Sequence, residues 1–366
     1  MNPGHVREKT DMVKAHALLI DLDKGQAAVI LARSMGLIDH SLRISSTEKK
    51  ICIPLLRPAD ESESKRLSLA LGGYSTEERE FKERRPARRT LIQALQNRLP
   101  PRLLAVLPKS FDVMGHVAIV ELPGELAPFE ELVGKAILET CTSIRTVMAK
   151  AGVFSTDYRV RDLRLIAGDD KPVTHYREHG CVFELDVRTV FFSPRLSYER
   201  LRVASQVQPS EIVIDMFAGV GPYSILIAKR QPSSTIYAVD VNPSAFKFLV
   251  SNTLANKVLG SVRPIRGDVR EVVRSDFSRM ADRVIMNLPG SAIDFINEAC
   301  LSLKERGGVI HFYSFESGEE PQKAASAKLQ DRVHASGRRV KSILATRIVK
   351  AVAPYRLQIA VDAVIA

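Results

Sequence analysis

The chain has 366 residues, and its 45% of apolar residues can fill the cores of two or three folded domains. Lysine and arginine outnumber aspartate and glutamate by 53 to 42. The resulting charge of +11 suits a polyanionic partner, although a generic basic surface would give the same value. The four cysteines form no C-x-x-C pair, so we expect neither a metal site nor a disulfide framework. No apolar run approaches the roughly 18 residues that span a bilayer, which argues against a membrane protein and predicts a cytoplasmic one.

The first elements in chain order form a small module. Residues 16–54 alternate apolar and polar side chains, then show helical spacing, and then alternate again. This pattern predicts a small N-terminal α/β domain over residues 1–58. Residues 59–102 are heavily charged and rich in arginine, which predicts a linker that is either a solvated spacer or an arm that contacts RNA.

The rest of the chain predicts two further domains. Residues 103–192 mix short strand-like runs with one helical stretch, which is typical of an α+β domain. From Ser193 a helix leads into strands that alternate with helices up to the C-terminus. This rhythm predicts an α/β fold, with a Rossmann-like domain of mostly parallel strands over residues 193–366.

A glycine-containing loop follows the first strand of that domain. The strand ends in Asp215, and the loop contains Phe217, Gly219 and Gly221. Glycines at such a turn let a ligand approach the backbone closely. Nicotinamide-binding folds have glycines here too, but Ser224 occupies the place of the third glycine of G-x-G-x-x-G. The D-x-F-x-G-x-G form predicts S-adenosylmethionine as the cofactor, contacted by these four residues.

Acidic residues also end the next two strands. Asp240 is followed by Val241, and Asp268 is followed by Val269. A carboxylate at the first of these positions can accept hydrogen bonds from both ribose hydroxyls of a nucleoside, and the second pair lies beside the expected adenine position. Either aspartate alone could be a helix cap or a turn residue. Because parallel strands end at one edge of a sheet, the three aspartates are expected to share one crevice.

The fourth strand ends in Asn287, Leu288 and Pro289, at the edge where methyltransferases keep the residues that meet the methyl acceptor. Amino-group methyltransferases often carry N-P-P-Y here, and this chain does not. The Asn287 amide can both donate and accept a hydrogen bond, while Pro289 fixes the turn. A plain turn at the end of a strand is an equally good interpretation on local grounds.

Longer motifs give a specific resemblance. The segments HYREHGCVFELDVRTVFFSPRLSYERLRV, VIDMFAGVGPYSI, MNLPGSAIDFI and HFYSFE together resemble the tRNA (guanine-37, N1) methyltransferase family of the archaeal and eukaryotic type. The match is close over residues 153–315, and the N-terminal module resembles the small domain with which the family inspects the tRNA body. The resemblance implies three domains ending in a class I methyltransferase domain with a seven-stranded, mostly parallel sheet. It also implies a monomer that acts on tRNA.

The resemblance assigns roles to individual positions. Glu199 falls at the general base, Arg159 at the catalytic arginine, and Asn287 and Pro289 at the N-x-P motif of the family. It places the following residues at cofactor-contacting positions: Arg200, Asp240, Val241, Asp268, Val269 and Asn287. Without it, Arg159 would be interpreted as a phosphate contact and Glu199 as a helix-surface ion pair with Arg195 or Arg202.

These assignments predict a mechanism. Guanine N1 carries a proton, so Glu199 is expected to face the crevice and remove it as the methyl group arrives. Arg159 would stabilise the charge that develops on O6, and the base would leave the anticodon-loop stack to reach the crevice. A basic C-terminal stretch that includes Arg347 and Lys350 could follow phosphates.

Three alternatives stay open. A wyosine-pathway aminocarboxypropyltransferase shares the fold and the cofactor, but the N-L-P motif and the Glu199 position favour methylation. A bifunctional member would also methylate a tricyclic guanine derivative. A non-catalytic RNA-binding protein with a vestigial pocket would fail to bind S-adenosylmethionine.

Overall fold

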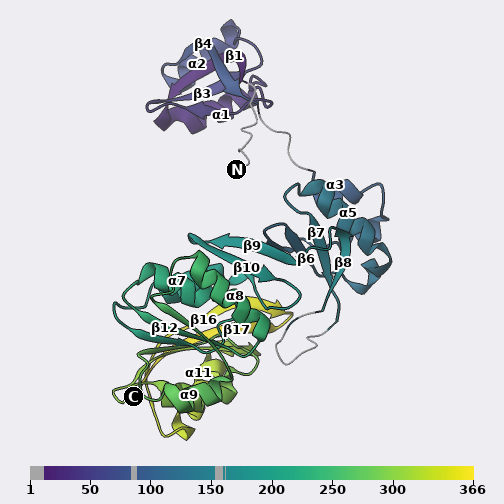
Figure 1. Ribbon diagram of the computed structural model, residues 1–366. Helices are drawn as coiled ribbons and strands as arrows, with labels where there is room; N and C mark the ends of the chain where they lie inside the picture. Colours follow the sequence, from purple (N-terminus) through teal and green to yellow (C-terminus); the bar gives the residue numbers. More distant parts are fainter. Residues whose placement is uncertain (1–11, 84–88, 153–159, 161) are drawn as a thin grey trace, which may run out of the picture. The chain divides into compact units, whose positions relative to one another are not determined.

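The computed structural model describes residues 12–83, 89–152, 160 and 162–366 (Figure 1). The chain divides into two compact units, Met1–Arg88 and Arg89–Ala366. Arg159, to which the family resemblance gives a catalytic role, lies outside the described residues.

The first unit is a small α/β domain built on an antiparallel sheet. Its strands lie in the order β2-β3-β1-β4. Its elements in chain order are β1 (Met12–Asp21), η1 (Leu22–Lys24), α1 (Gly25–Ser34), β2 (Ser45–Ser46), β3 (Lys50–Leu55), α2 (Glu61–Leu71) and β4 (Ser75–Lys82). Both helices supply the core, Ala28 and Ala32 from α1 and Leu67 and Leu71 from α2.

Residues 59–102, for which the charge predicted a linker, contain the ordered elements α2 and β4. A capping box begins α2, because Asp60 and Glu63 each accept a hydrogen bond from the backbone N–H of the other. Most charged side chains of α2 and β4 are exposed, whereas Leu67 and Phe81 are buried. The charged residues of this segment therefore lie on the solvent-facing side of α2 and β4. A few well-spaced apolar residues are enough to pack both elements into the core of the first unit.

The second unit begins with an α+β part. Its four-stranded sheet has the order β5-β6-β7-β8, in which only β6 and β7 are parallel. The elements are α3 (Leu91–Leu95), α4 (Pro101–Ala105), β5 (Asp112–Met114), β6 (Val117–Val120), η2 (Gly124–Phe129), α5 (Glu130–Thr140), β7 (Thr146–Lys150) and β8 (Leu163–Gly168). An antiparallel hairpin of β9 (Val173–Glu178) and β10 (Cys181–Asp186) follows.

A seven-stranded sheet forms the body of the second unit. Its order is β13-β12-β11-β14-β15-β17-β16, and all its neighbours are parallel except β17, which is antiparallel to β15 and β16. The strands are β11 (Ile212–Asp215), β12 (Thr235–Asp240), β13 (Val262–Arg266), β14 (Arg283–Met286), β15 (Gly308–Ser317), β16 (Val340–Ala353) and β17 (Arg356–Ile365). This topology confirms the predicted Rossmann-like fold.

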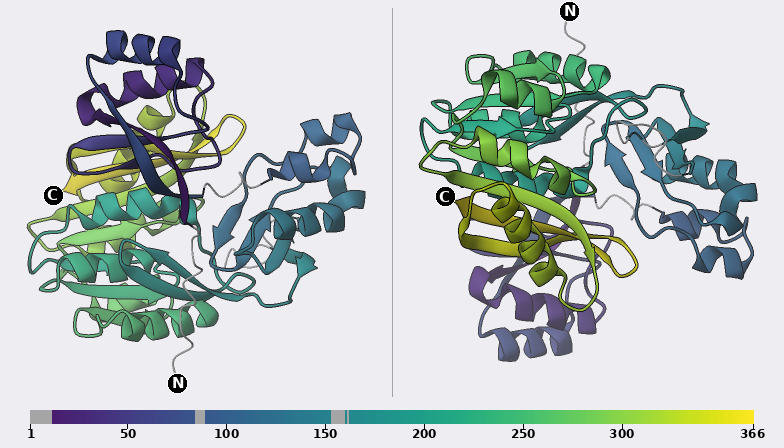
Figure 2. Two further views of the ribbon diagram at one scale, coloured as in Figure 1. Left: turned by 90° about the horizontal axis from the view of Figure 1, so that it is seen from above. Right: turned by 90° about the horizontal axis from the view of Figure 1, so that it is seen from below.

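Helices cover both faces of this sheet (Figures 1 and 2). One face packs against α6 (Ser197–Ala204), α7 (Pro222–Arg230) and α8 (Pro243–Ala255), and the other against α9 (Val269–Asp276), α10 (Ile296–Ser302) and α11 (Pro321–Ala335). The short helices η3 (Pro194–Leu196) and η4 (Ala292–Phe295) precede α6 and α10. The strand order reverses between β11 and β14, which places a crevice at the carboxyl ends of these strands. Among the described residues, no helix combines the length and apolarity needed to cross a bilayer.

Candidate active site

The loop after β11 contains two glycines whose backbone conformations other residues rarely adopt. Gly219 and Gly221 have φ values of +56° and +90°, in the left-handed region that favours glycine. A Cβ at Gly221 would lie 2.6 Å from Leu249 Cδ1, whereas a Cβ at Gly219 would have Phe191 O at 3.8 Å as its nearest neighbour. Gly221 is thus needed for packing, and Gly219 leaves its backbone open to a ligand.

Asp215, at the end of β11, is a buried carboxylate with an incomplete set of partners. Ser224 Oγ donates to Oδ2 at 2.7 Å, and Oδ1 has no hydrogen-bond partner among the described residues. Burial raises the pKa of Asp215 to about 7. A buried acceptor of this kind fits a ligand that brings a donor or a positive charge.

Asp240, at the end of β12, is held by backbone groups. Gly219 N donates to Oδ2 at 2.6 Å and Asn242 N donates to Oδ1 at 2.9 Å, while burial raises the pKa of Asp240. Each oxygen keeps a further lone pair, so the carboxylate can accept hydroxyl hydrogens from a ribose. The next residue, Val241, is half exposed beside it.

Asp268 differs from the other two aspartates because a neighbour occupies its carboxylate. Its Oδ1 caps α9 by accepting from Arg270 N at 2.9 Å, and the Arg270 guanidinium forms an ion pair with it. The hydrogen bonds from Arg270 lower the pKa of Asp268. Gly267 N donates to Asp240 O at 3.2 Å, which ties the ends of β12 and β13 together, and Val269 is buried.

An aromatic ring that the sequence patterns did not single out packs beside the glycine loop. Phe295, from η4, packs edge-on against Phe217 with ring centroids 5.0 Å apart, and the Arg270 guanidinium lies 5.3 Å from the Phe295 ring centre. Both phenylalanines are partly buried. The only signal in the sequence was an aromatic residue a few positions after the N-L-P motif.

Asn287 and Pro289, which follow β14, are bonded to β17 and β15, respectively. Gln358 Nε2 of β17 donates to Asn287 Oδ1 at 3.4 Å, and Phe315 N of β15 donates to Pro289 O at 3.1 Å. The last residue of β14, Met286, pairs with Phe312 of β15, so Asn287 follows at the level of Tyr313.

Glu199 of α6 reaches the same level of the sheet. Its side chain is only 3% exposed, and Tyr313 Oη donates to its Oε1 at 2.8 Å. The Arg202 guanidinium donates to Oε1 at 2.7 Å and to Oε2 at 2.9 Å. The predicted ion pair with Arg202 exists, but it is buried rather than on the helix surface. With one hydrogen bond to Oε2, that oxygen keeps a lone pair on the side where Arg347 Nε lies 3.9 Å away.

A network of buried charges extends from Arg202 across the sheet. Arg202 also pairs with Asp362, whose Oδ1 lies 2.7 Å from His311 Nδ1. Although burial opposes it, the contacts with His311 and Arg202 lower the pKa of Asp362. Burial lowers the pKa of His311, which favours the neutral ring. On the other side of Glu199, Tyr223 Oη donates to Tyr313 Oη at 3.2 Å.

Arg200, expected at the cofactor, is 1% exposed and bound to protein groups. Its guanidinium donates to both Glu178 carboxylate oxygens at 2.6 and 2.7 Å and to Ser193 O at 3.2 Å. It therefore fixes the loop before α6 to β9. The other arginine considered as a partner of Glu199, Arg195, pairs instead with Asp112 of β5 at 2.7 Å.

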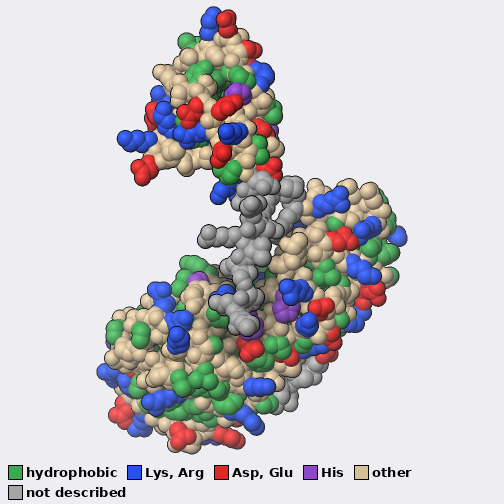
Figure 3. Space-filling view, turned by 45° about the horizontal axis from the view of Figure 1, so that its top comes forward, with side chains coloured by type: hydrophobic (Ala, Val, Ile, Leu, Met, Phe, Trp, Pro, Cys, Tyr) green, Lys and Arg blue, Asp and Glu red, His purple; other side chains and the backbone are tan. Residues whose placement is uncertain are grey.

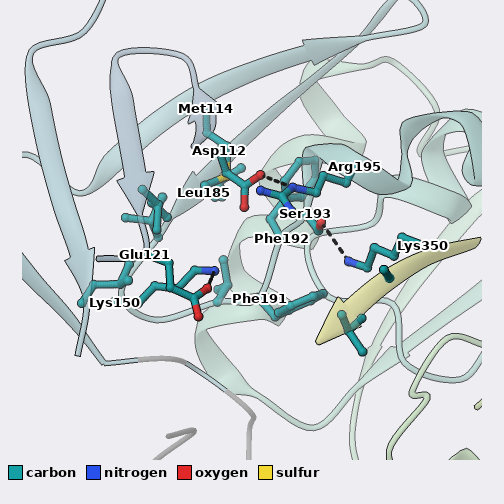
Figure 4. A pocket seen from close by; sticks show the side chains of 16 residues that line it. Asp112, Met114, Glu121, Lys150, Leu185, Phe191, Phe192, Ser193, Arg195 and Lys350 are labelled. Carbon is teal, nitrogen blue, oxygen red and sulfur yellow. Dashed lines mark hydrogen bonds and ion pairs between the residues drawn. The ribbon is translucent and has the colours of Figure 1, made fainter. Parts of the chain in front are cut away.

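A cavity of about 190 Å³ lies between the small sheet and the loop before α6 (Figure 4). The small sheet contributes Asp112, Glu121 and Lys150, and the loop contributes Phe191, Phe192 and Ser193 to its lining. Lys350 of β16 closes the opposite wall, where its Nζ donates to Ser193 Oγ at 3.4 Å. The backbone of Phe191 also faces Gly219, so the cavity adjoins the glycine loop.

Comparisons with known proteins place the chain in a family. The TRM5/TYW2 methyltransferase domain family matches residues 174–341, and the TYW2 N-terminal domain family matches residues 91–171. The tRNA (guanine(37)-N(1))-methyltransferase Trm5b of Pyrococcus abyssi is 35% identical over 94% of this chain and 98% of its own length. The Trm5b of Methanocaldococcus jannaschii is 32% identical over 89% of this chain and 92% of its own.

Solved structures extend the similarity to the fold. An aTrm5 structure in complex with tRNALeu has a TM-score of 0.69 and 28% identity, and it covers 96% of this chain and 99% of its own. The Pyrococcus horikoshii TYW2 structure in complex with MeSAdo has a TM-score of 0.63 and 28% identity. The matched region spans 97% of the TYW2 chain but only 75% of this one.

Proposed function

The chain belongs to the TRM5/TYW2 methyltransferase family, and we propose that it transfers a methyl group from S-adenosylmethionine to N1 of guanine 37 in tRNA. The observation that carries the proposal is the placement of Glu199, a buried carboxylate at the level of Asn287 whose Oε2 accepts one hydrogen bond, from Arg202. The Trm5b relative of Pyrococcus abyssi supports it, because that protein bears this activity in its name and matches almost the whole chain.

The residues at the carboxyl ends of β11 and β12 fit the cofactor. Asp215 Oδ1 is a buried acceptor without a partner among the described residues, and a Cβ at Gly219 would meet only Phe191 O, at 3.8 Å. Asp240 offers lone pairs for the ribose, and Phe217 with Phe295 offers apolar surface for a purine. When bound, S-adenosylmethionine supplies an electrophilic methyl group on a positively charged sulfur.

Glu199 performs the proton transfer in this proposal. As the bond between guanine N1 and the methyl carbon forms and the bond from that carbon to sulfur breaks, Glu199 Oε2 accepts the N1 proton. Arg202 and Tyr313 hold the carboxylate in one orientation. Because the side chain is already ordered, the reaction has little further conformational entropy to remove from it. Asn287 and Pro289 are assigned to the acceptor base, since they follow β14 at the level of Tyr313, which donates to this carboxylate.

Arg159 keeps its proposed role at guanine O6. Removing the N1 proton moves electron density onto O6, and a planar guanidinium there would stabilise the transition state more than the ground state. Arg159→Lys would retain the charge but lose the fork, so we expect a large fall in the methylation rate.

We propose tRNA as the partner and a cytoplasmic monomer as the acting form. The charge of +11 supports a polyanionic partner, and Figure 3 shows basic side chains dispersed among acidic ones over the visible face of the second unit. No single strongly basic patch stands out on that face of the described residues. Binding is therefore expected to combine charge with shape and base contacts rather than rest on charge alone.

Aminocarboxypropyl transfer is the second candidate, because the TYW2 N-terminal domain family matches residues 91–171. The share of this chain that each kind of solved structure covers favours methylation. A quarter of this chain has no counterpart in the Pyrococcus horikoshii TYW2 structure, whereas the Trm5b structure from Pyrococcus abyssi covers 96% of the chain.

The experiment that tests the proposal uses two preparations of S-adenosylmethionine, one labelled on the methyl carbon and one on the aminocarboxypropyl chain. Each is incubated with the protein and an unmodified tRNA transcript that has guanine at position 37. We expect only the methyl label in the RNA. Label from the aminocarboxypropyl chain would support the second candidate. Transfer of neither label, together with no binding of S-adenosylmethionine in calorimetry, would support a non-catalytic protein.

A further inference from the structure

The turn between β16 and β17 exposes an aromatic side chain almost completely to solvent. Tyr355 is 93% exposed and has a φ of +59°, a conformation that glycine or asparagine adopts at lower free energy. Ala353 pairs with Arg356 across the turn, so Tyr355 lies at the tip of a tight hairpin. An exposed ring held at an unfavourable φ indicates a contact outside the chain.

The hairpin tip lies at the same end of the sheet as the acceptor residues. Arg356 pairs with Ser317 of β15, and its guanidinium lies 4.9 Å from the Phe315 ring centre. Phe315 N donates to Pro289 O, and two residues beyond Arg356 the Gln358 amide donates to Asn287. In both views of Figure 2 the yellow hairpin projects beyond the body of the sheet. Tyr355 therefore stands next to the mouth of the crevice.

The charge of the hairpin fits a nucleic acid. Residues 340–357 contain no aspartate or glutamate, and their basic residues are Lys341, Arg347, Lys350 and Arg356. The stem of the hairpin also lines the cavity beside the glycine loop, through Lys350, Ala351 and Val352 (Figure 4). The same hairpin thus lines the cavity, contacts the acceptor residues and carries the exposed ring, and it is positively charged.

We propose that this hairpin tip binds single-stranded RNA, with Tyr355 stacked on an anticodon-loop base next to the extruded guanine. The inference rests on the proposed function. Extruding a base removes its stacking from its neighbours, and an aromatic ring can replace that contact regardless of the sequence. Arg356 keeps the tip positive for the adjoining phosphates.

The first test measures steady-state kinetics of Tyr355→Ala, Tyr355→Phe and Leu259→Ala on an unmodified tRNA. Leu259 is a matched control, since it is 55% exposed and precedes β13 at the opposite end of the sheet. We expect Tyr355→Ala to lower kcat/KM for tRNA roughly tenfold, as for the loss of one stacked base. Tyr355→Phe and Leu259→Ala should match the wild type, and all variants should bind S-adenosylmethionine equally.

A wild-type value for Tyr355→Ala would overturn the inference, and so would an equal loss in Tyr355→Phe, which keeps the ring. If the wild-type protein itself transferred no methyl group to position 37, the proposed function would fail instead. A second measurement then still tests the contact. A fluorescent 2-aminopurine placed at position 36 or 38 should be quenched on binding to the wild type and not to Tyr355→Ala, and equal quenching by both would contradict the stacking.

Discussion

Two buried carboxylates of the second unit, Asp215 and Glu199, have opposite surroundings. Asp215 accepts one hydrogen bond from a hydroxyl, its other oxygen has no partner among the described residues, and its pKa is raised to about 7. Glu199 accepts hydrogen bonds from the Arg202 guanidinium and from Tyr313. Both oxygens of Glu199 thus accept hydrogen bonds from the protein, whereas one oxygen of Asp215 accepts none from the described residues.

This difference suits Asp215 to binding a ligand and Glu199 to accepting a proton. A buried anion without a compensating charge is unstable, so Asp215 favours a positively charged or donor ligand, as the cofactor would be. A carboxylate that is already fixed by donors needs no rearrangement before it accepts a proton. We infer that the bound cofactor supplies the missing partner of Asp215, whereas the carboxylate of Glu199 is already oriented before RNA binds.

The largest expected effect is on the chemical step. Glu199→Gln keeps the shape of the side chain but cannot accept the N1 proton, so the single-turnover rate should fall about 10²- to 10⁴-fold with tRNA affinity unchanged. The matched control is Glu298→Gln, another buried glutamate, which pairs with Arg274. Rapid-quench assays measure the rates, and normal turnover by the Glu199 variant would show that Glu199 is not the base.

The next effect concerns the support behind Glu199. Asp362→Asn would leave the buried Arg202 cation short of a partner, and we expect it to lower the free energy of unfolding by about 3–5 kcal/mol. Because the folded-state pKa of Asp362 is lowered, its contribution is present above the unfolded value and lost as the pH falls. Urea denaturation should therefore show a gap between wild type and variant that narrows below about pH 4. A gap independent of pH would mean that packing alone explains the loss.

Tyr313→Phe removes one donor from Glu199 without changing the packing. A hydrogen bond to a charged group contributes about 1.5–3 kcal/mol, so we expect kcat to fall roughly 10- to 100-fold with an unchanged KM for tRNA. Tyr223→Phe, whose hydroxyl lies one step further away, should have a smaller effect on kcat. An unchanged kcat for Tyr313→Phe would reduce Tyr313 to a packing residue.

The smallest effect is on cofactor binding. If a positively charged cofactor stabilises ionised Asp215, binding releases a proton below pH 7, and affinity should weaken by up to about tenfold per pH unit as the pH falls. Calorimetry in two buffers with different ionisation enthalpies measures the proton release. Asp215→Asn should remove it, and equal heats for the wild type in both buffers would place the positive charge elsewhere.

The fold and the cofactor loop could be predicted because their signals are local. The D-x-F-x-G-x-G pattern and an acidic residue after each of three strands depend on neighbouring positions, and parallel strand ends bring them together. The charged segment was harder, because α2 buries only a narrow row of apolar side chains that includes Leu67 and Leu71. The amino-acid composition gives the number of charged residues in a segment but does not show which face of a helix they occupy.

The surroundings of Glu199 could not be predicted from the sequence. Its partner Tyr313 lies 114 residues away, and Asp362 lies 160 residues from Arg202. Such contacts arise from the position of β15 and β17 in the sheet, which no local pattern encodes. The use of Arg200 to hold Glu178, rather than standing free for the cofactor, has the same origin.

The product nucleoside tests the central claim most directly. Two tRNA transcripts that differ only in guanine or adenine at position 37 are incubated with methyl-labelled S-adenosylmethionine, digested and analysed by mass spectrometry. The account predicts N1-methylguanosine from the first transcript, at position 37, and no methylated nucleoside from the second. Methylation at another position, or equal methylation of both transcripts, would contradict it.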